Sequence, residues 1–471
     1  MRPQEPALLI DFGSTYTKLV VVDLAGAEII AQAEAVTTAE TDITVGLREA
    51  LGRLPGGLGQ RAQNFPHKLA CSSAAGGLRV VAIGLVSELT AEAAKRAALG
   101  AGARVLAVYT HHLTLHELQE IVELAPDMVL LAGGTDGGNQ RVILHNARVL
   151  ARSTLPAPIV VAGNKDAAEE VEAILRQGGK SVRLTENVMP GLGQINVHPA
   201  RRAIRELFTE RIVEAKGFKA AQAYVERILM PTPAAVMRAA RLLAQGTDEE
   251  QGLGELMVVD VGGATTDVHS IAAGEPQSRT VIQRGLPEPY AKRTVEGDLG
   301  LRVSAVSLLE AVGQKRLQQQ IGLEGNLDLD EVTQALAENV GQVPRNAEER
   351  AIDEGMAQAA VELGVARHVG TLREIYLPTG HCFAQEGKDL TGIGHLIGTG
   401  GIFSHTTRLW EILAAALFDP ANPFLLRPRA PRLWVDRRYI LWAMGLLAEV
   451  SPQAALHIMR EHLEEVYRGR A

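Results

Sequence analysis

Cysteine and aromatic residues are scarce in this chain of 471 residues. The two cysteines are too few for a four-thiolate zinc or iron–sulfur site within one chain. They also do not make a disulfide framework, which favours a reducing cytoplasm as the location. Aromatic residues amount to only 4%, so stacking platforms for single-stranded nucleic acid are not expected. A net charge of −8 without a long basic stripe argues further against nucleic acid as a partner.

Long hydrophobic runs are missing as well. The apolar run before Asp11 is too short for a signal or membrane-spanning segment, and no other run approaches the length of a span. We therefore expect a soluble, cytoplasmic protein with no membrane partner. The composition is otherwise ordinary for a globular protein, with 46% hydrophobic and 22% charged residues. The length suffices for two or more domains, each with its own core.

Short apolar runs alternate with helical patterns in the first part of the chain. Thr114 and Glu117 have the spacing of a capping box, and Thr232-Pro233 is typical of a helix start. The alternation predicts an α/β fold with a mainly parallel sheet. The predicted buried strands are residues 7–11, 18–23, 78–84, 103–109, 127–134 and 158–163.

A polar, glycine-rich stretch at 246–254 indicates a boundary between domains. We place domain I at residues 1–250 and domain II at 255–404. The segment 405–471 is expected to be helical and to pack back on domain I.

Two glycine-containing hairpins share one pattern. LLIDFGSTYTKLVVVD (8–23) has a strand that ends at Asp11, and MVVDVGGATTDVHS (257–270) repeats this with Asp260 and adds Asp267. Each alone could be a plain hairpin, because glycine supplies the positive φ of tight turns. Glycines also let backbone N–H groups approach a phosphate, and carboxylates hold Mg²⁺ through water. Two such hairpins, each starting a domain, favour two phosphate loops that face each other across a cleft.

A third glycine stretch, GIGHLIGTGGIF, occupies residues 392–403. An apolar strand runs into Gly-Thr-Gly-Gly at 398–401, and a pattern that could start a helix follows. Glycines there would let a base and ribose lie against the backbone. The chain has no GxxxxGK[ST] sequence, so a P-loop is excluded.

The order of these three motifs resembles the acetate and sugar kinase/Hsp70/actin superfamily. The whole chain is similar to the MutL/GlmL family of accessory proteins of glutamate (methylaspartate) mutase, which is distinct from the DNA-repair protein that shares a name. The resemblance implies a two-domain, actin-like (ribonuclease H-like) ATPase fold with an interdomain nucleotide cleft. It also implies a chaperone-like ATPase that reactivates an adenosylcobalamin-dependent mutase. The stretches that carry the resemblance are LIDFGSTYTKL, LLAGGTDGGN (130–139), VDVGGATTDVHS, EPYAKRTVEGDLGLR (288–302) and GIGHLIGTGGIFSH (392–405).

The superfamily resemblance implies ATP and Mg²⁺ as cofactors. Asp11 and Asp260 would organise Mg²⁺ through waters, with Asp267 nearby as a third catalytic carboxylate. The residues implied at the β- and γ-phosphates are Gly13, Ser14, Thr15, Gly262, Gly263, Thr265 and Thr266. Those implied at the adenosine are Gly398, Thr399, Gly400 and Gly401. Ala264 departs from the third glycine of Hsp70-type loops, and Lys18 is interpreted as packing or pairing at the surface.

Two other functions stay open at this point: a small-molecule kinase of the same superfamily and an actin-like filament protein. Residues 130–139 fit either an anion site at a helix start or a structural turn, and Thr135, Asp136 and Asn139 favour the anion site slightly. Residues 288–302 fit either a nucleotide or partner contact or a solvated turn with salt bridges. A polar helix entry is favoured over a metal site for His111, His112 and His116, and a small buried residue over a reactive thiol for Cys71. The oligomeric state is not predicted.

Overall fold

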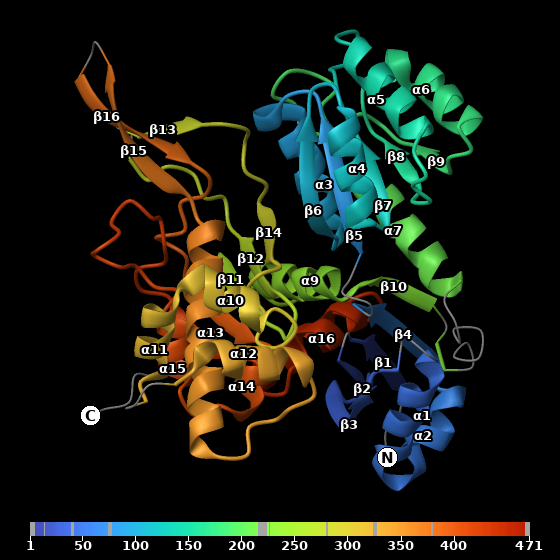
Figure 1. Ribbon diagram of the computed structural model, residues 1–471. Helices are drawn as coiled ribbons and strands as arrows, with labels where there is room; N and C mark the ends of the chain where they lie inside the picture. The colour runs from blue at the N-terminus through green and yellow to red at the C-terminus, as the bar shows by residue number, and fades with distance from the viewer. Residues whose placement is uncertain are drawn as a thin grey trace. The chain divides into compact units, whose positions relative to one another are not determined.

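The computed structural model describes residues 5–13, 15–38, 42–73, 78–214, 224–225, 227–278, 281–323, 327–377 and 380–466 (Figure 1). The chain divides into two compact units. The larger unit comprises residues 1–74 and 219–471, and the smaller comprises residues 75–218.

The first sheet of the larger unit has the order β10-β4-β1-β2-β3. Its first three strands along the chain pair antiparallel, and the other two run parallel to β1. Six of the seven residues of β1 are buried, as the apolar run predicts. The strands are β1 (Pro6–Phe12), β2 (Tyr16–Asp23), β3 (Glu28–Val36), β4 (His67–Ser72) and β10 (Arg227–Pro231).

The second sheet repeats this arrangement in the order β14-β12-β11-β17-β18-β19. Again an antiparallel trio is followed by two strands parallel to the first, and β19 is added antiparallel at the edge. The strands are β11 (Leu256–Val261), β12 (Thr266–Ile271), β14 (Ala291–Glu296), β17 (His395–Thr399), β18 (Arg432–Val435) and β19 (Glu464–Val466). A duplicated sheet with this order and these directions is the ribonuclease H-like arrangement of actin-like proteins, so the predicted fold class is confirmed.

The last parallel strand of each sheet leads into a helix, and these two helices pack together. They are α9 (Thr232–Gln245) after β10 and α16 (Leu441–Leu447) after β18. A Cβ on Gly445 would lie 1.9 Å from the Ala235 carbonyl oxygen, so only glycine allows this approach. Leu9 of the first sheet and Val258 of the second belong to the same buried core as these helices.

The other face of the second sheet packs against a separate core around α13 (Ala347–His368). Further elements of the larger unit include a three-stranded sheet of β13 (Val281–Arg284), β16 (Gly380–Glu386) and β15 (Thr371–Leu377). The larger unit also contains the helices α1 (Ile43–Arg53), α2 (Leu58–Arg61), α10 (Ala305–Val312), α11 (Gln314–Ile321), α12 (Leu329–Glu338), α14 (Gly401–His405), α15 (Leu409–Ala414) and α17 (Pro452–His462).

The smaller unit is a five-stranded, all-parallel sheet in the order β6-β5-β7-β8-β9. It is inserted in the sequence between β4 and β10, and it has its own apolar core. The capping box of Thr114 and Glu117 is confirmed. The elements are β5 (Arg79–Gly84), α3 (Glu92–Ala101), β6 (Arg104–Thr110), α4 (Leu115–Leu124), β7 (Met128–Leu131), α5 (Arg141–Ala151), β8 (Ile159–Val161), α6 (Lys165–Gln177), β9 (Val182–Leu184) and α7 (His198–Glu214).

The mainly parallel sheet predicted for the first part of the chain is in fact two sheets. The runs at 7–11 and 18–23 pair antiparallel in the larger unit, and the other four runs are parallel strands of the smaller unit. Apolar runs alone carry no information on strand direction. The boundaries proposed at 250/255 and 404/405 stay a prediction. In the described part of the chain, we find no helix with the length and hydropathy of a membrane span.

Candidate functional site

The hairpins β1–β2 and β11–β12 are equivalent in register. Asp11 pairs with Lys18 across the first ladder, and Asp260 pairs with Asp267 across the second. Lys18 therefore stands where the second hairpin has Asp267. Both turns are closed by equivalent backbone hydrogen bonds. Gly13 N donates to the Tyr16 carbonyl oxygen (3.1 Å), and Gly262 N donates to the Thr265 carbonyl oxygen (2.9 Å).

The first glycine of each turn lies close to the carbonyl oxygen that closes the turn. A Cβ on Gly13 would lie 2.5 Å from the Tyr16 oxygen, and one on Gly262 would lie 3.0 Å from the Thr265 oxygen. Neither glycine has a positive φ. Close approach within the turn, and not the positive φ expected for a plain hairpin, therefore accounts for these glycines.

The two turns lie against each other within the larger unit. A Cβ placed on Gly263 would be 3.9 Å from the Thr15 hydroxyl oxygen and 3.5 Å from Cβ of Arg302. The tips of the two hairpins are therefore in contact. Ser14, predicted in the same turn, lies outside the described residues.

Asp11 is buried, and its Oδ1 is hydrogen-bonded. Its Oδ1 accepts hydrogen bonds from the Thr232 hydroxyl (2.6 Å), which belongs to the first residue of α9, and from Cys71 Sγ (3.6 Å). Burial, followed by the charge of Asp11, raises the pKa of the Cys71 thiol well above its usual value. Cys71 is thus a buried neutral thiol, in line with the structural interpretation.

Lys18 was interpreted as packing or pairing at the surface; it does pack and pair, but away from the surface. Its side chain is 19% exposed, and Nζ lies 3.5 Å from Asp11 Oδ2. Nζ also lies 4.5 Å from the centre of the Tyr439 ring. The alternation of β2 turns Lys18 toward Asp11, because cross-strand partners point to the same face.

Asp260 is half-buried, and its Oδ1 has no hydrogen-bond partner among the described residues. Burial raises the pKa of this carboxyl to about 7, assisted by the charges of Asp267, Asp436 and Asp11 and opposed by Lys18. Four carboxylates are therefore close enough to interact. A desolvated oxygen without a donor is suited to a bound water or a hydrated cation.

Asp267 already has charged and neutral donors. Its Oδ1 accepts from Arg293 Nε (2.7 Å) and pairs with Nη2 (2.6 Å), and its Oδ2 accepts from the Thr265 hydroxyl (3.0 Å). The Thr266 hydroxyl is buried and donates to the Leu299 oxygen (2.7 Å). Arg293 belongs to the 288–302 segment, which also contacts this hairpin through Leu301 N and Arg302 N, donors to the carbonyl oxygens of Gly262 and Gly263.

The adenosine turn predicted at 398–401 packs mostly inside the protein. A Cβ on Gly398 would lie 2.7 Å from the Phe403 ring, and one on Gly400, which has φ +113°, would lie 2.2 Å from the Val261 oxygen. Gly401 has nothing within 4 Å of such a position, so it alone of these glycines faces open space.

Thr399 of this turn is buried and donates to Asp436 Oδ2 (2.9 Å). Asp436 also accepts from the backbone N–H groups of Ile440 (3.0 Å) and Leu441 (2.9 Å), at the start of α16. Sequence reasoning missed Asp436. The available signal was a third apolar run that ends in aspartate, RLWVD at 432–436, like LLID and MVVD.

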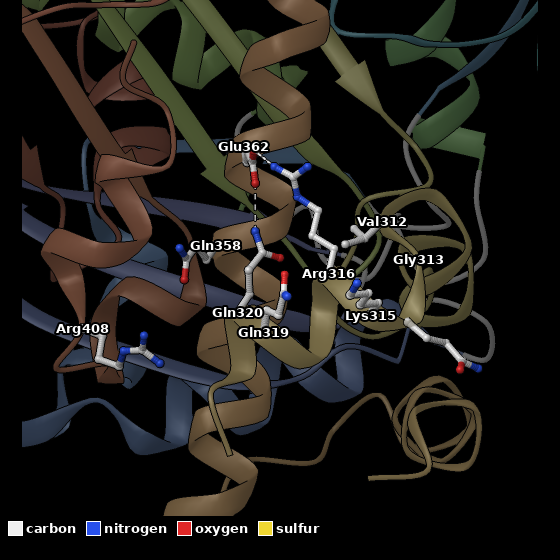
Figure 2. A pocket seen from close by; sticks show the side chains of 10 residues that line it. Val312, Gly313, Lys315, Arg316, Gln319, Gln320, Gln358, Glu362 and Arg408 are labelled. Atoms are coloured by element: carbon white, nitrogen blue, oxygen red, sulfur yellow. Dashed lines mark hydrogen bonds and ion pairs between the residues drawn. The ribbon is translucent and has the colours of Figure 1, made fainter. Parts of the chain in front are cut away.

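A cavity of about 730 Å³ opens among α10, α11, α13 and the segment before α15 (Figure 2). Glu362 of α13 pairs with Arg316 and accepts from Gln320 Nε2 (2.9 Å). The lining contains cations and amides and none of the predicted site residues. It consists of Val312, Gly313, Gln314, Lys315, Arg316, Gln319, Gln320, Gln358, Glu362 and Arg408.

The loop at 130–139 satisfies its polar groups internally. Asp136 Oδ1 accepts from the backbone N–H of Lys165 (3.0 Å), at the start of α6, and from Asn187 Nδ2 (2.9 Å). Asn139 Oδ1 accepts from Val142 N (3.2 Å). Since the loop's own carboxylate occupies the helix start, the geometry favours the structural interpretation over an anion site.

Most charges of the 288–302 segment form ion pairs within the larger unit. Arg367 binds both Glu296 (2.9 Å) and Asp298 (2.7 Å), and Arg302 binds Asp353 (2.7 Å). Over the described ranges, no group of three or more histidine, cysteine, aspartate or glutamate side chains is arranged to ligate a metal directly.

The duplicated sheet, with two facing hairpins that each carry an aspartate, defines an α/β protein of the actin-like class. The chain matches the model of the MutL protein family over residues 7–463. Protein MutL of Clostridium tetanomorphum is 52% identical over 459 residues, which cover 98% of this chain and 99% of that protein. The chain belongs to the MutL protein family.

Solved structures with some likeness include three proteins at 9–11% identity. Gluconate kinase from Lactobacillus acidophilus has a TM-score of 0.36, with 99% of this chain and 93% of that chain covered. A glycerol dehydratase reactivase has a TM-score of 0.34, with 94% of this chain and 99% of that chain covered. The ethanolamine utilization protein EutJ from Carboxydothermus hydrogenoformans has a TM-score of 0.27, with 96% of this chain and 90% of that chain covered. TM-scores this low add no argument to the strand order and register described above.

Proposed function

We propose that this protein binds Mg-ATP between its two hairpins and hydrolyses it as a chaperone-like accessory protein. Its partner would be an adenosylcobalamin-dependent mutase such as glutamate (methylaspartate) mutase, and its task the reactivation of that enzyme. The observation that carries the nucleotide part is the meeting of two equivalent hairpins that bring Asp11 and Asp260 into one carboxylate cluster. Membership of the MutL family supports the mutase as partner.

Asp11 and Asp260 would hold Mg²⁺ through bound water. The unpartnered, buried Oδ1 of Asp260 fits a hydrated cation, and so does its pKa, which burial and then the neighbouring carboxylates raise, since a positive charge would favour the ionised form. When bound, the ion would neutralise charge on the transferred phosphoryl group.

Lys18 supplies the cation of the first hairpin for the terminal phosphates. Arg293 is committed to Asp267, whereas Lys18 makes a longer 3.5 Å contact with Asp11 and is better able to turn toward a ligand. Asp260 would orient the attacking water through a hydrogen bond to its otherwise unpartnered Oδ1.

The nucleoside would extend toward the cavity on α11 and α13. Asp353 of α13 binds Arg302, which lies beside Gly263, and Gln358 lies five residues further, about 7.5 Å along the helix. Arg408 reaches the cavity from the segment that follows Gly401 and α14. Arginine and amide side chains stack on and hydrogen-bond to a base.

Phosphate release from Mg-ATP, with and without an inactivated mutase and fresh adenosylcobalamin, tests this proposal. We expect hydrolysis that the mutase stimulates, together with recovery of mutase activity. Transfer of phosphate to a metabolite would instead establish the small-molecule kinase. ATP-dependent sedimentation would establish the filament protein.

The variant Gly263→Ala gives a site-specific control for that assay. The added Cβ has only ordinary contacts of 3.5 Å and longer, so the fold should tolerate it. It would nevertheless stand between the turn and a phosphate, and we expect at least a tenfold loss of turnover. Unchanged turnover would contradict the placement of the phosphates.

A further inference from the structure

We propose that Tyr439 is a positioning residue that holds the Lys18 ammonium in place for the ligand. This inference rests on the proposed nucleotide site and adds a residue to it that no sequence motif marks. Tyr439 comes from the turn before α16, and Lys18 comes from β2.

The backbone at Tyr439 is in the left-handed region, with φ +51°. An L-residue with an aromatic side chain rarely adopts this conformation, and such strain persists only where the surroundings impose it. Asp436 imposes it here. The Asp436 carbonyl accepts from Tyr439 N (3.2 Å), and its carboxylate accepts from Ile440 N and Leu441 N. The turn that caps α16 thereby directs the ring toward Lys18.

The ring gives Lys18 a partner without neutralising it. Nζ lies 4.5 Å from the ring centre, a cation–π distance, and 3.5 Å from Asp11 Oδ2. A flexible lysine close to Asp11 and Asp260 would otherwise be free to pair with either of them. The ring confines the ammonium at the Asp11 side while leaving its positive charge available to a phosphate.

The phenol itself remains uncharged. Burial, followed by the charges of Asp260, Asp11, Asp436 and Asp267, raises the pKa of the Tyr439 hydroxyl well above its usual value. Tyr439 therefore acts on Lys18 through its ring face, and phenylalanine should replace it.

A purely structural role for the ring would give different results. Tyr439 also packs at the border of the core formed by α9 and α16. If packing were its only role, its loss would cost the same whether or not residue 18 is a lysine. A double-mutant cycle separates the two roles, because coupling appears only between residues that interact.

We would measure nucleotide affinity in the full chain for Tyr439→Phe and Tyr439→Gly, each with Lys18 and with Lys18→Met. Glycine adopts φ +51° freely, so the turn is kept. We expect Tyr439→Gly to weaken affinity about three- to tenfold and Tyr439→Phe less than about twofold. In the Lys18→Met background, Tyr439→Gly should add less than about twofold. Equal losses in both backgrounds would overturn the inference.

A second readout needs no nucleotide. Reductive ¹³C-methylation keeps the lysine charge, and methyl groups over an aromatic ring shift upfield in NMR spectra. We expect such a shift for Lys18, assigned with Lys18→Arg, retained in Tyr439→Phe and lost in Tyr439→Gly. Ala125→Gly, at another positive φ in the smaller unit, is the matched control and should leave the shift unchanged.

An unshifted Lys18 in the unaltered protein would overturn the inference. If nucleotide does not bind at all, the proposed function fails, and the shift alone decides the position of Lys18.

Discussion

Asp260 illustrates how a single carboxylate can be unfavourable for stability and still suit a binding site. Its folded-state pKa of about 7 lies above the ordinary value of 3.8. Between these two pH values the folded protein binds the extra proton, so the free energy of unfolding falls as pH rises from about 4 to 7. Each unit of pKa difference corresponds to about 1.4 kcal/mol.

At pH values above 7, Asp260→Asn should therefore raise the melting temperature of the protein. The same change should remove Mg-dependent nucleotide binding. The gain should shrink toward pH 4, where the native carboxyl is protonated in the folded state. Calorimetric unfolding of both proteins across pH 4–8 measures it. A variant that is less stable than the native protein at pH 8 would contradict the described surroundings of Asp260.

His269 has the opposite pH dependence. In the described part of the chain neither ring nitrogen has a hydrogen-bond partner, and burial lowers its pKa to about 3. The unfolded chain binds the proton from about pH 6.5 downward, so this residue costs stability as pH falls from 6.5 to 3.

His269→Leu should flatten the acid limb of the stability curve by about 1.4 kcal/mol per pH unit. Denaturant unfolding between pH 4 and 7 checks the slope. His116→Leu is the matched control, because the His116 side chain is 83% exposed and its replacement should not alter the slope. Equal slopes for native protein and His269→Leu would refute the prediction.

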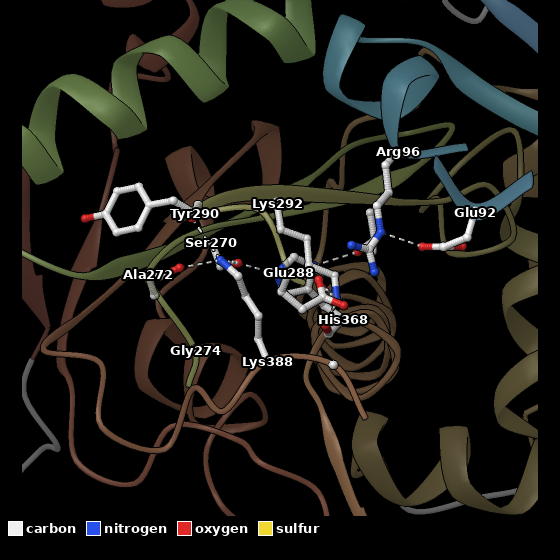
Figure 3. Close-up of polar contacts among 12 residues, drawn as sticks. Glu92, Arg96, Ser270, Ala272, Gly274, Glu288, Tyr290, Lys292, His368 and Lys388 are labelled. Carbon is white, nitrogen blue, oxygen red and sulfur yellow. Dashed lines mark hydrogen bonds and ion pairs between the residues drawn. The ribbon is translucent and has the colours of Figure 1, made fainter. Parts of the chain in front are cut away.

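At the scale of elements, polar contacts join β12 to the end of α13 (Figure 3). His368 binds the Ser270 hydroxyl (2.8 Å) through Nε2 and the Thr294 hydroxyl (2.9 Å) through Nδ1. Burial and the charges of Lys292 and Lys388 lower the pKa of His368 well below its usual value. The neutral imidazole therefore holds β12, the strand that carries Asp267, against the end of α13.

The hairpins themselves could be predicted from the sequence, since an apolar run that ends in Asp-x-Gly encodes strand, turn and carboxylate locally. The partners of those carboxylates could not. Thr232 reaches Asp11, and Tyr439 reaches Lys18, through contacts between segments far apart in the chain.

Glycines also carry an ambiguous signal. Gly400 was assigned to a ligand, yet close packing against Val261 already accounts for its identity.

The adenosine turn offers a sharp comparison between neighbouring glycines. Gly400→Ala would place a Cβ 2.2 Å from the Val261 oxygen at φ +113°, and we expect a loss of about 3 kcal/mol or more. Gly401→Ala meets nothing within 4 Å and should change stability by less than about 1 kcal/mol. Chemical denaturation of both variants decides this. Equal stabilities would mean that the turn does not pack against the second hairpin.

At the scale of the whole molecule, every residue proposed for the nucleotide belongs to the larger unit. The smaller unit enters between β4 and β10 and has its own core. Its contribution to nucleotide binding and to contact with the partner can therefore be tested by its removal.

Replacement of residues 75–218 by a short glycine–serine linker should leave ATP affinity within about threefold of the native value. It should also reduce stimulation by the mutase, if this unit contacts the partner. Calorimetric titration with ATP, alongside a thermal melt to verify folding, checks the first expectation. A folded variant that no longer binds ATP would show that the site extends into the smaller unit.

The most direct test of the central claim is calorimetric titration of the native protein with ATP, with and without Mg²⁺, repeated for Asp11→Asn, Asp260→Asn and the double variant. One site formed by both hairpins predicts Mg-dependent binding that each single change weakens at least tenfold, and a double variant scarcely weaker than either single one. Asp127→Asn in the smaller unit should bind as the native protein does. Affinity that is independent of Mg²⁺ and unchanged by Asp11→Asn and Asp260→Asn would contradict the account.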